Sequence, residues 1–132
     1  MRALLLHIRD DVFAVPMAAA LKVVVAPQVA PLPTTTGTVA GLINLRGEIV
    51  PVLDTATLLG LGALSSITYV AVVETVLGPA GLAVTEVGES VELGESIGAT
   101  DAHGTVAAYA LGTKVAVMID VETLLAPVRT AT

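Results

Sequence analysis

Gly41-Leu-Ile-Asn-Leu-Arg-Gly-Glu-Ile-Val-Pro-Val-Leu-Asp-Thr-Ala-Thr-Leu-Leu-Gly60 is the stretch around which this chain is organised. Aliphatic and β-branched residues fill both sides of its middle and predict two strands, Val39 to Leu45 and Glu48 to Leu53. Arg46-Gly47 lies between them and predicts a tight turn, because glycine adopts positive φ without steric cost. The stretch therefore predicts a β-hairpin that presents an arginine at its tip.

Two short helical turns are predicted at related places in the chain. Asp54 is a suitable N-cap for a turn that Gly60 ends. The segment from Val52 to Leu59 lines up with the segment from Met118 to Leu125, 66 positions later, and Asp120 takes the place of Asp54. This alignment indicates an internal repeat with one copy in each half of the chain.

A second, shorter alignment supports the repeat, because Phe13-Ala14-Val15 matches Leu82-Ala83-Val84, 69 positions later. Each half then offers about five short strands, and five strands can close a small barrel around an apolar interior. We therefore predict a mostly β fold of two five-stranded barrels packed side by side. A groove should lie between them, with short helical turns near residues 54–60 and 120–125.

Length and composition restrict the possible functions. The 132 residues suffice for one compact domain that buries about two thirds of its unfolded surface. Apolar residues make up 55% of the chain but aromatic residues only 2%, so the core must consist of aliphatic side chains. The net charge of −6 argues against nucleic-acid binding, which needs basic patches and aromatic stacking platforms. The lack of cysteine excludes a disulfide framework and a thiolate metal site.

The long uncharged stretch from Thr55 to Val73 raises the question of a membrane span. Its 19 residues would just cross a bilayer core. Glycine, serine and threonine residues interrupt it, so we predict a helix end, a loop and a strand instead. The apolar run near the N-terminus, Ala3 to Leu6, is too short for a signal peptide. We expect a cytoplasmic protein with no direct membrane insertion.

The titratable residues do not combine into a known catalytic or metal site. The sequence has no Gly-x-Ser-x-Gly motif, no His-Glu-x-x-His motif and no phosphate-binding glycine loop. His7 is better explained as a strand residue than as a base. Glu89, Glu92 and Glu95 do not match an oxygen-ligand loop and are expected on a solvated strand face or loop. We therefore predict no enzyme, no metal and no cofactor.

Arg46 has two possible roles at the predicted hairpin tip. A neighbouring carboxylate such as Glu48 could hold it in an ion pair, which contributes little at the surface. Alternatively, Arg46 could anchor a protein interface, because its guanidinium offers five donors in a rigid fork and arginine is frequent at binding hot spots. The residues alone favour the first role. Asn44 likewise either hydrogen-bonds the turn or contacts a partner.

Five further residues are expected to have structural roles: Gly41, Pro51, Asp54, Gly81 and Asp120. The two aspartates are the predicted helix caps. Pro51 has no N–H to donate, so its strand should lie at a sheet edge or contain a bulge at that point.

The hairpin also carries a resemblance to a known family. Asn44-Leu-Arg-Gly47, followed by Ile49-Val-Pro-Val-Leu-Asp54, resembles the central signature of CheW-like domains, the adaptor domains of bacterial chemosensory arrays. The similarity extends upstream to Pro33 and downstream to Gly81-Leu-Ala-Val84 and Ile119-Asp120. It covers nearly the whole chain. The chain departs from the family's usual acidic, aromatic and aspartate residues at three positions, Val25, Thr38 and Thr85.

The resemblance implies a single CheW-like domain over residues 1–132, built from two five-stranded SH3-like barrels. Because the first strand crosses over in that family, one barrel would span about 12–74, and the other 1–8 plus 80–132. The matching arginine of the family lies by the groove and is implicated in receptor engagement. The resemblance therefore favours partner binding by Asn44, Arg46 and Gly47.

The function implied by the resemblance is that of a non-enzymatic adaptor. It would couple the cytoplasmic tip of a methyl-accepting chemoreceptor to the regulatory domain of a CheA-like histidine kinase. The residues also leave an alternative open, in which a small β-barrel module binds an apolar ligand between its halves, or another protein partner outside chemotaxis.

Overall fold

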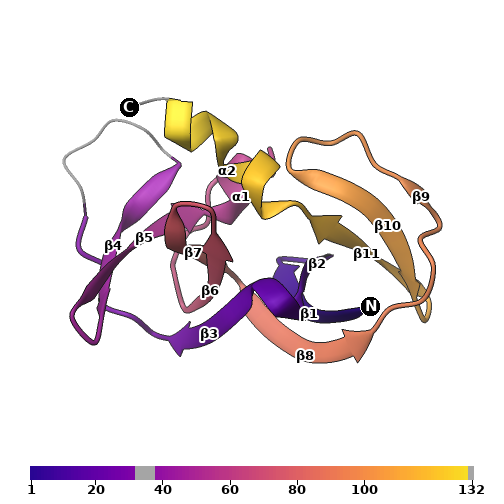
Figure 1. The fold of residues 1–132 in the computed structure, drawn as a ribbon, viewed down its shortest axis with the longest axis horizontal. Coiled ribbons are helices and arrows are strands. Elements are labelled where there is room, and N and C mark those ends of the chain that lie inside the picture. The colour runs from indigo at the N-terminus through magenta and orange to yellow at the C-terminus, as the bar shows by residue number, and fades with distance from the viewer. Residues whose placement is uncertain (32–37, 131–132) are drawn as a thin grey trace.

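In a computed structural model, the protein consists mainly of strands arranged as two units side by side (Figure 1). The structure describes residues 1–31 and 38–130. The strands are β1 (Arg2–Ile8), β2 (Asp11–Pro16), β3 (Ala20–Val25), β4 (Val39–Leu45), β5 (Glu48–Asp54), β6 (Tyr69–Thr75), β7 (Gly78–Val84), β8 (Glu86–Glu92), β9 (Gly98–Ala99), β10 (Thr105–Leu111) and β11 (Lys114–Ile119). The helices are α1 (Thr55–Leu58) and α2 (Val121–Thr130), and a 3₁₀ turn covers Met17–Ala19.

The strands form two sheets of the same topology. The five-stranded sheet has the order β3-β6-β7-β5-β4, and the six-stranded sheet has the order β8-β1-β2-β11-β10-β9. Each contains one parallel pair, β5 with β7 and β11 with β2, among antiparallel neighbours. Residues 98–99 supply the sixth strand, which pairs only with β10. The predicted mostly β fold of two small units side by side is confirmed, with one two-residue strand more than expected.

The two edges of each sheet are brought together by the chain itself. Beyond β3, Ala30 pairs with Leu42 of β4, and their backbone groups exchange hydrogen bonds of 2.8 and 2.9 Å. In the six-stranded sheet, β8 forms one edge, and the chain continues from it directly into β9, which forms the opposite edge. Both sheets therefore curl toward closure, which leaves little free strand edge.

The predicted barrel boundaries differ from these sheets at two strands. We expected residues 12–74 in one barrel and residues 1–8 plus 80–132 in the other. In the structure β2 stays with β1, and β7 stays with β6, so the sheets comprise residues 20–84 and residues 2–16 plus 86–119. Two-residue turns join both pairs into hairpins, and such tight turns keep consecutive strands adjacent. The crossover therefore follows the second strand rather than the first.

The internal repeat is present, but one of its two alignments is shifted. Asp54 N donates to the Thr38 carbonyl at 2.8 Å, and Asp120 N donates to the Gly104 carbonyl at 2.9 Å, which preserves the spacing of 66. The parallel ladders pair Val52 with Gly81 and Met118 with Ala14.

Gly81 is therefore equivalent to Ala14, 67 positions apart, rather than the 69 that the sequence alignment predicted. A slip of two residues keeps every side chain on the same face, so the apolar pattern cannot distinguish the two alignments. Phe13 consequently corresponds to Ala80.

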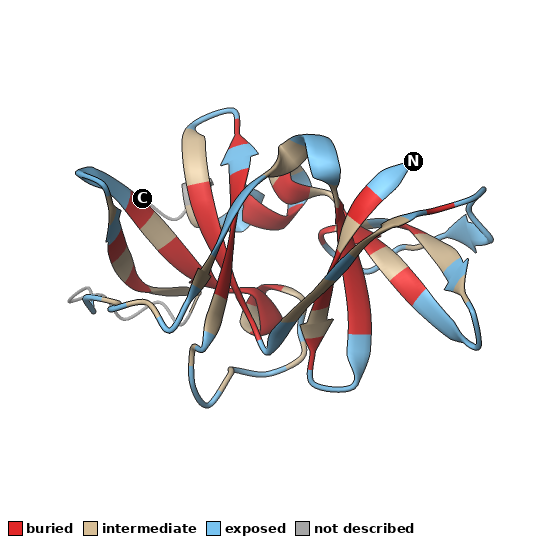
Figure 2. Cartoon of the chain, turned by 90° about the horizontal axis from the view of Figure 1, so that it is seen from below, coloured by how far each residue is buried: buried red, intermediate tan, exposed pale blue. Residues whose placement is uncertain are grey.

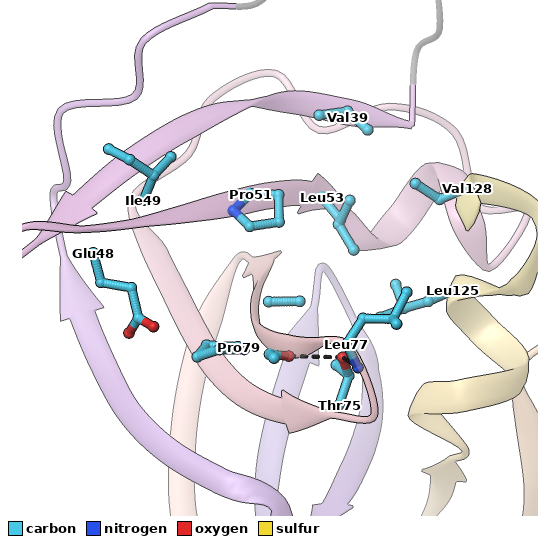
Figure 3. Close-up of a pocket in the computed structure, with 12 residues that line it drawn as sticks. Val39, Glu48, Ile49, Pro51, Leu53, Thr75, Leu77, Pro79, Leu125 and Val128 are labelled. Atoms are coloured by element: carbon cyan, nitrogen blue, oxygen red, sulfur yellow. Dashed lines mark hydrogen bonds between the residues drawn. The ribbon is translucent and has the colours of Figure 1, made fainter. Parts of the chain in front are cut away.

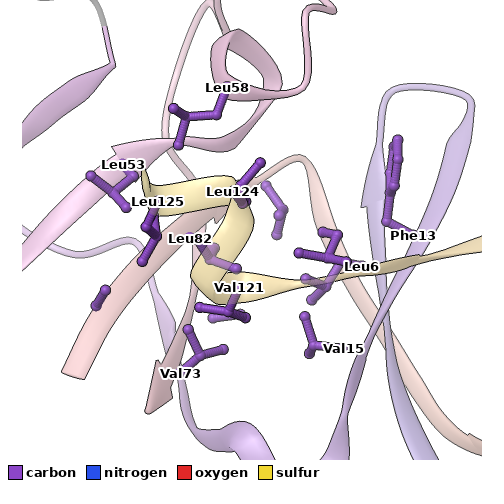
Figure 4. Packing of buried hydrophobic residues seen from close by; sticks show 14 of the residues in the cluster. Leu6, Phe13, Val15, Leu53, Leu58, Val73, Leu82, Val121, Leu124 and Leu125 are labelled. Atoms are coloured by element: carbon purple, nitrogen blue, oxygen red, sulfur yellow. The ribbon is translucent and has the colours of Figure 1, made fainter. Parts of the chain in front are cut away.

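Buried hydrophobic side chains form three clusters. One lies within each barrel, and a third, the central cluster, lies between them (Figure 4). On β6, Val70 and Val72 belong to the cluster inside the five-stranded barrel, whereas Ala71 and Val73 belong to the central cluster. The middle strands are therefore buried on both faces (Figure 2). The central cluster includes Leu6, Val15, Val73, Leu82, Leu124 and Leu125.

The last helix is longer than the turn predicted at 120–125. α2 continues through Pro127 to Thr130, although proline removes one helical hydrogen bond. Val128 packs against the central cluster, and this contact favours the additional turn. With ten residues, α2 is the longest helix of the described chain, and none of the described helices is long and apolar enough to cross a membrane.

Pro51 does not lie on an edge strand, contrary to one of the two predicted explanations. β5 is flanked by β4 and β7, and its ladder with β7 covers only Val52 to Asp54. The proline thus stands just before the parallel ladder begins, where no donor to β7 is required. A register shift is present, but it lies between Val39 and Gly41 of the neighbouring strand β4.

Candidate partner-binding site

The tip of the β4–β5 hairpin is a rigid two-residue turn. Arg46 has a φ of 52° and Gly47 a φ of 90°. Positive φ at both central residues is the geometry whose twist matches the flanking strands. Asn44 Oδ1 accepts a hydrogen bond from the Gly47 backbone N–H at 2.8 Å, which is the contact expected if Asn44 supports the turn. The backbone at Arg46 is therefore fixed by the pairing of Leu45 with Glu48 and by the hydrogen bond between Asn44 and Gly47.

The Arg46 side chain is exposed at this tip. The ion pair with Glu48 that the sequence suggested is not formed, and Arg46 makes no ion pair with any residue in the described ranges. Its five donors thus project from a fixed backbone toward solvent. A bidentate acceptor such as a carboxylate could bind there without first displacing a described charged partner.

A second cation lies beside Arg46. A cleft of about 450 Å³ is lined by Arg46, Lys22 and Glu48 together with Leu21, Leu45, Val72 and Pro79. Lys22 comes from β3, which is separated from β5 by β6 and β7 in the sheet. Sequence reasoning missed this neighbour, because only closure of the barrel brings the two edges near each other.

An apolar trough adjoins this cleft. It has a volume of about 370 Å³ and lies between β5, the β6–β7 turn and the second half of α2 (Figure 3). Glu48 and Pro79 line both the cleft and the trough, so the two lie next to each other. Most side chains along the trough are aliphatic, notably Val39, Ile49, Leu53, Leu77, Leu125 and Val128.

The predicted structural residues occupy crowded or hydrogen-bonded positions. A Cβ on Gly41 would lie 2.3 Å from the Ala30 carbonyl oxygen, and a Cβ on Gly81 would lie 2.6 Å from Val70 Cγ1. Both distances are too short for any larger residue without local movement.

The two aspartates cap the helices as predicted. Asp54 Oδ1 accepts from the Thr57 N–H at 3.1 Å, and its Oδ2 accepts from the Leu64 N–H at 3.1 Å. Asp120 Oδ1 accepts from the Thr123 N–H at 3.5 Å, and its Oδ2 accepts from the Thr123 hydroxyl at 2.9 Å.

Arg9 holds the two barrels together and was missed by the sequence analysis. Its guanidinium donates to three backbone carbonyls of the loop after α1, those of Leu61, Gly62 and Ala63, at 2.8, 3.2 and 2.7 Å. Its backbone N–H donates to Thr85 Oγ1 at 3.0 Å. Because Arg9 lies between β1 and β2, this contact joins the six-stranded barrel to the five-stranded one. In the sequence Arg9 is followed by Asp10 and Asp11, and nothing near it indicates a partner more than fifty residues away.

The two histidines and the acidic residues Glu89, Glu92 and Glu95 line neither the cleft nor the trough. His7 is half-buried on β1, and His103 Nε2 lies 3.4 Å from the Leu124 carbonyl oxygen. In the described part of the chain, no group of three or more histidines, aspartates or glutamates is arranged to hold a metal ion. Glu92 is bound by the N-terminal ammonium at 2.9 Å, and this hydrogen bond lowers the pKa of its carboxyl.

The sequence and the fold were each compared with known proteins, and both comparisons found the same family of proteins. The sequence matches the family model of the CheW-like domain over residues 2–128. The fold is similar to the crystal structure of scaffolding protein TtCheW from Thermoanaerobacter tengcongensis, with a TM-score of 0.85 and 24% sequence identity. This similarity covers 95% of the present chain and 92% of that chain, and at such identity it concerns the fold alone. A search of curated proteins found no match.

Proposed function

Because the chain belongs to the CheW-like domain family, we propose that it joins the cytoplasmic tip of a methyl-accepting chemoreceptor to the regulatory domain of a CheA-like histidine kinase. The family couples receptors and CheA in chemotaxis arrays, and a coupling adaptor role follows for this member. We infer that the protein works in the cytoplasm, where both partner domains lie, and performs no chemistry of its own.

The observation that carries the receptor side of this proposal is the exposed guanidinium on a rigid turn. Arg46 has no charged partner among the described residues, and Asn44 fixes the backbone beneath it. Lys22 adds a second cation to a protein whose net charge is −6. A receptor surface with carboxylates would complement this local charge, and arginine anchors of this kind often dominate binding energy.

The two-barrel architecture supports binding of two partners at once. Each barrel has its own hydrophobic cluster, and the central cluster joins them into one body. We place the receptor at the Arg46 side of the five-stranded barrel and the kinase domain at the six-stranded barrel. The two contacts would then not compete for the same surface, as an adaptor requires.

Replacement of Arg46 tests the receptor contact. In Arg46→Ala the turn should keep its geometry, because alanine adopts the positive φ of position 46 at about the same cost as arginine does. We expect a loss of about 2 kcal/mol in receptor binding, roughly a 30-fold rise in Kd, with a thermal melting curve close to that of the native chain. Isothermal titration with a purified receptor cytoplasmic fragment measures the first and calorimetry the second.

Lys114→Ala is the matched control. Lys114 is an exposed cation that begins β11 and corresponds to Glu48 at the hairpin of the other barrel. Its removal changes the net charge by the same amount and should leave receptor affinity unchanged. An Arg46→Ala variant that binds the receptor normally would remove Arg46 from the contact. An unfolded variant would instead show that the arginine is structural.

A further inference from the structure

The repeat makes one barrel an internal reference for the other. β10 and β11 pair in the same register as β4 and β5, 66 positions earlier. Tyr109 is paired with Ala116 in the first ladder, and Ile43 is paired with Val50 in the second. Each residue of the six-stranded barrel near this ladder and the start of α2 can therefore be compared with its counterpart in the five-stranded barrel.

The six-stranded barrel has an open pocket beside the start of α2, with a volume of about 370 Å³. We call it the acidic pocket. It shares no lining residue with the cleft or with the apolar trough, so it is a separate feature of the surface. Apolar side chains and three carboxylates line it, including Val106, Tyr109, Met118, Glu74, Asp120 and Glu122.

The five-stranded barrel covers the equivalent place with its own chain. After α1, the positive φ of Gly60 (77°) turns the chain back. The Leu61 N–H donates to the Ala56 carbonyl at 2.8 Å, and the Leu64 N–H donates to Asp54 Oδ2 at 3.1 Å. Ala56 and Asp54 are the counterparts, 66 positions earlier, of two acidic residues of the pocket. The loop after α1 therefore lies where the other barrel is open.

A leucine side chain fills this place in the five-stranded barrel. Leu64 packs against the cluster that contains Ile43 and Val52. These two residues are the counterparts of Tyr109 and Met118, which line the acidic pocket. α2 continues as a helix for ten residues instead of turning back, so no segment of the described chain takes the role of the returning loop there. The acidic pocket is therefore a place for an aliphatic side chain that the described chain leaves open.

The carboxylates determine the charge of the segment that suits the acidic pocket. Glu122 stands where the five-stranded barrel has an alanine, and its Oε2 accepts from the Val76 N–H at 3.1 Å. Among the described residues that line the pocket, none is lysine or arginine, and the Met1 ammonium is paired with Glu92 at 2.9 Å. A basic side chain would complement this charge. Asp120 can also accept a further N–H, because a carboxylate oxygen offers two lone pairs.

We propose that the acidic pocket binds an extended segment of a partner protein through one leucine and one adjoining lysine or arginine. The leucine side chain lies against Tyr109 and Met118, as Leu64 lies against their counterparts. The leucine N–H donates to Asp120, and the basic side chain faces Glu74. This site is separate from the receptor contact, so its existence does not depend on the adaptor role.

The first experiment titrates the full chain with short peptides and follows the methyl NMR signals of Met118 and Val106. The probe is acetyl-Leu-Gly-Ala-Leu-Lys-Lys-Ile-amide, which follows residues 61–67 with both serines replaced by lysine. It should shift both sets of signals. A peptide with alanine in place of the second leucine should bind about tenfold more weakly, because less apolar surface is buried. A peptide with glutamate in place of both lysines should give no shifts, because the carboxylates repel it.

Val106→Lys tests the same site from the protein side. Val106 is 48% exposed, so the fold should tolerate lysine there, and the new ammonium should raise the Kd of the lysine peptide about tenfold. Val115→Lys is the matched control, because Val115 is 47% exposed, lies on the neighbouring strand and does not line the acidic pocket. It should leave the Kd unchanged. Glu74→Gln should raise the Kd about threefold at low ionic strength.

Several results would overturn the proposal. They are the absence of shifts with the lysine peptide, equal affinity for the alanine or the glutamate peptide, and equal loss in Val106→Lys and Val115→Lys. Light scattering of the native chain alone adds one further check. A concentration-dependent dimer that Val106→Lys abolishes would show that a second copy of the chain occupies the pocket, and this result would also contradict binding of a basic partner segment.

Discussion

Removal of the Arg9 side chain should loosen the connection between the two barrels. Its three hydrogen bonds to the carbonyls of Leu61, Gly62 and Ala63 are exposed, so each contributes about 0.5–1 kcal/mol net. Arg9→Ala should therefore lower the free energy of unfolding by about 1.5–3 kcal/mol. For 132 residues the unfolding entropy is about 0.28 kcal/mol/K, so Tm should fall by about 5–11 °C.

Two further variants separate the hydrogen bonds from the backbone. Arg9 has a φ of 55°, which costs roughly 1 kcal/mol for a residue with a Cβ. Arg9→Gly should therefore be about 1 kcal/mol more stable than Arg9→Ala, although both lose the same side-chain bonds. Arg9→Lys keeps the charge but not the fork, and should fall between Arg9→Ala and the native chain.

Urea unfolding followed by circular dichroism measures these differences, and native-state hydrogen exchange shows where they act. The Leu64 N–H donates to Asp54 Oδ2 and lies in the loop whose carbonyls accept from Arg9. This amide should therefore exchange faster in Arg9→Ala than in the native chain. If Arg9→Ala unfolds at the same urea concentration as the native chain, the guanidinium does not hold the barrels together. The three hydrogen bonds of Arg9 would then contribute nothing to the free energy of unfolding.

Two other changes test the fold and its charges. Gly41→Ala should destabilise the chain by more than about 2 kcal/mol in urea unfolding, because the new Cβ would lie 2.3 Å from the Ala30 carbonyl oxygen; an unchanged midpoint would mean that the segment at Ala30 does not close the barrel. The hydrogen bond from the Met1 ammonium is the main cause of the lowered pKa of Glu92. The pair therefore stabilises the fold at pH values above the ordinary glutamate pKa. This stabilisation is lost as the pH falls through the lowered pKa. NMR titration should therefore place the Glu92 pKa below that of Glu92 in the chain with an acetylated N-terminus, and identical values would contradict the ion pair.

Features encoded within a short stretch could be predicted from the sequence. The hairpin from Val39 to Asp54 combines an aliphatic run and a largely β-branched run with Arg46-Gly47, whose turn geometry follows from residues only a few positions apart. The caps Asp54 and Asp120 are also local. Scarce aromatic residues and abundant aliphatic ones indicated strands buried in aliphatic clusters, which the structure shows on β6 and β7.

Features that depend on pairing between distant segments could not be predicted in the same way. The parallel ladder between β2 and β11, about a hundred residues apart, places the β1–β2 hairpin in the same sheet as the last strands of the chain. The register of the repeat was missed because a two-residue slip leaves the pattern of buried faces intact. The resemblance to a family indicated two barrels, but the strand that crosses between them had to be seen in the ladders.

The candidate site follows the same division. Arg46, Asn44 and Gly47 could be named because they occupy one turn. Lys22 could not, because its position beside Arg46 follows from closure of the sheet. The apolar trough was equally hidden, since β5, the β6–β7 turn and α2 come together only in the folded chain.

The central claim is that this chain bridges two proteins at once. It is tested by mixing the full chain with a receptor cytoplasmic fragment and a CheA-type regulatory domain, and by measuring the mass of the complex by size exclusion with light scattering. The account predicts one ternary species that contains all three components and that breaks into kinase-bound chain and free receptor fragment with Arg46→Ala. Mutually exclusive binary complexes, or no complex with either partner, would contradict it.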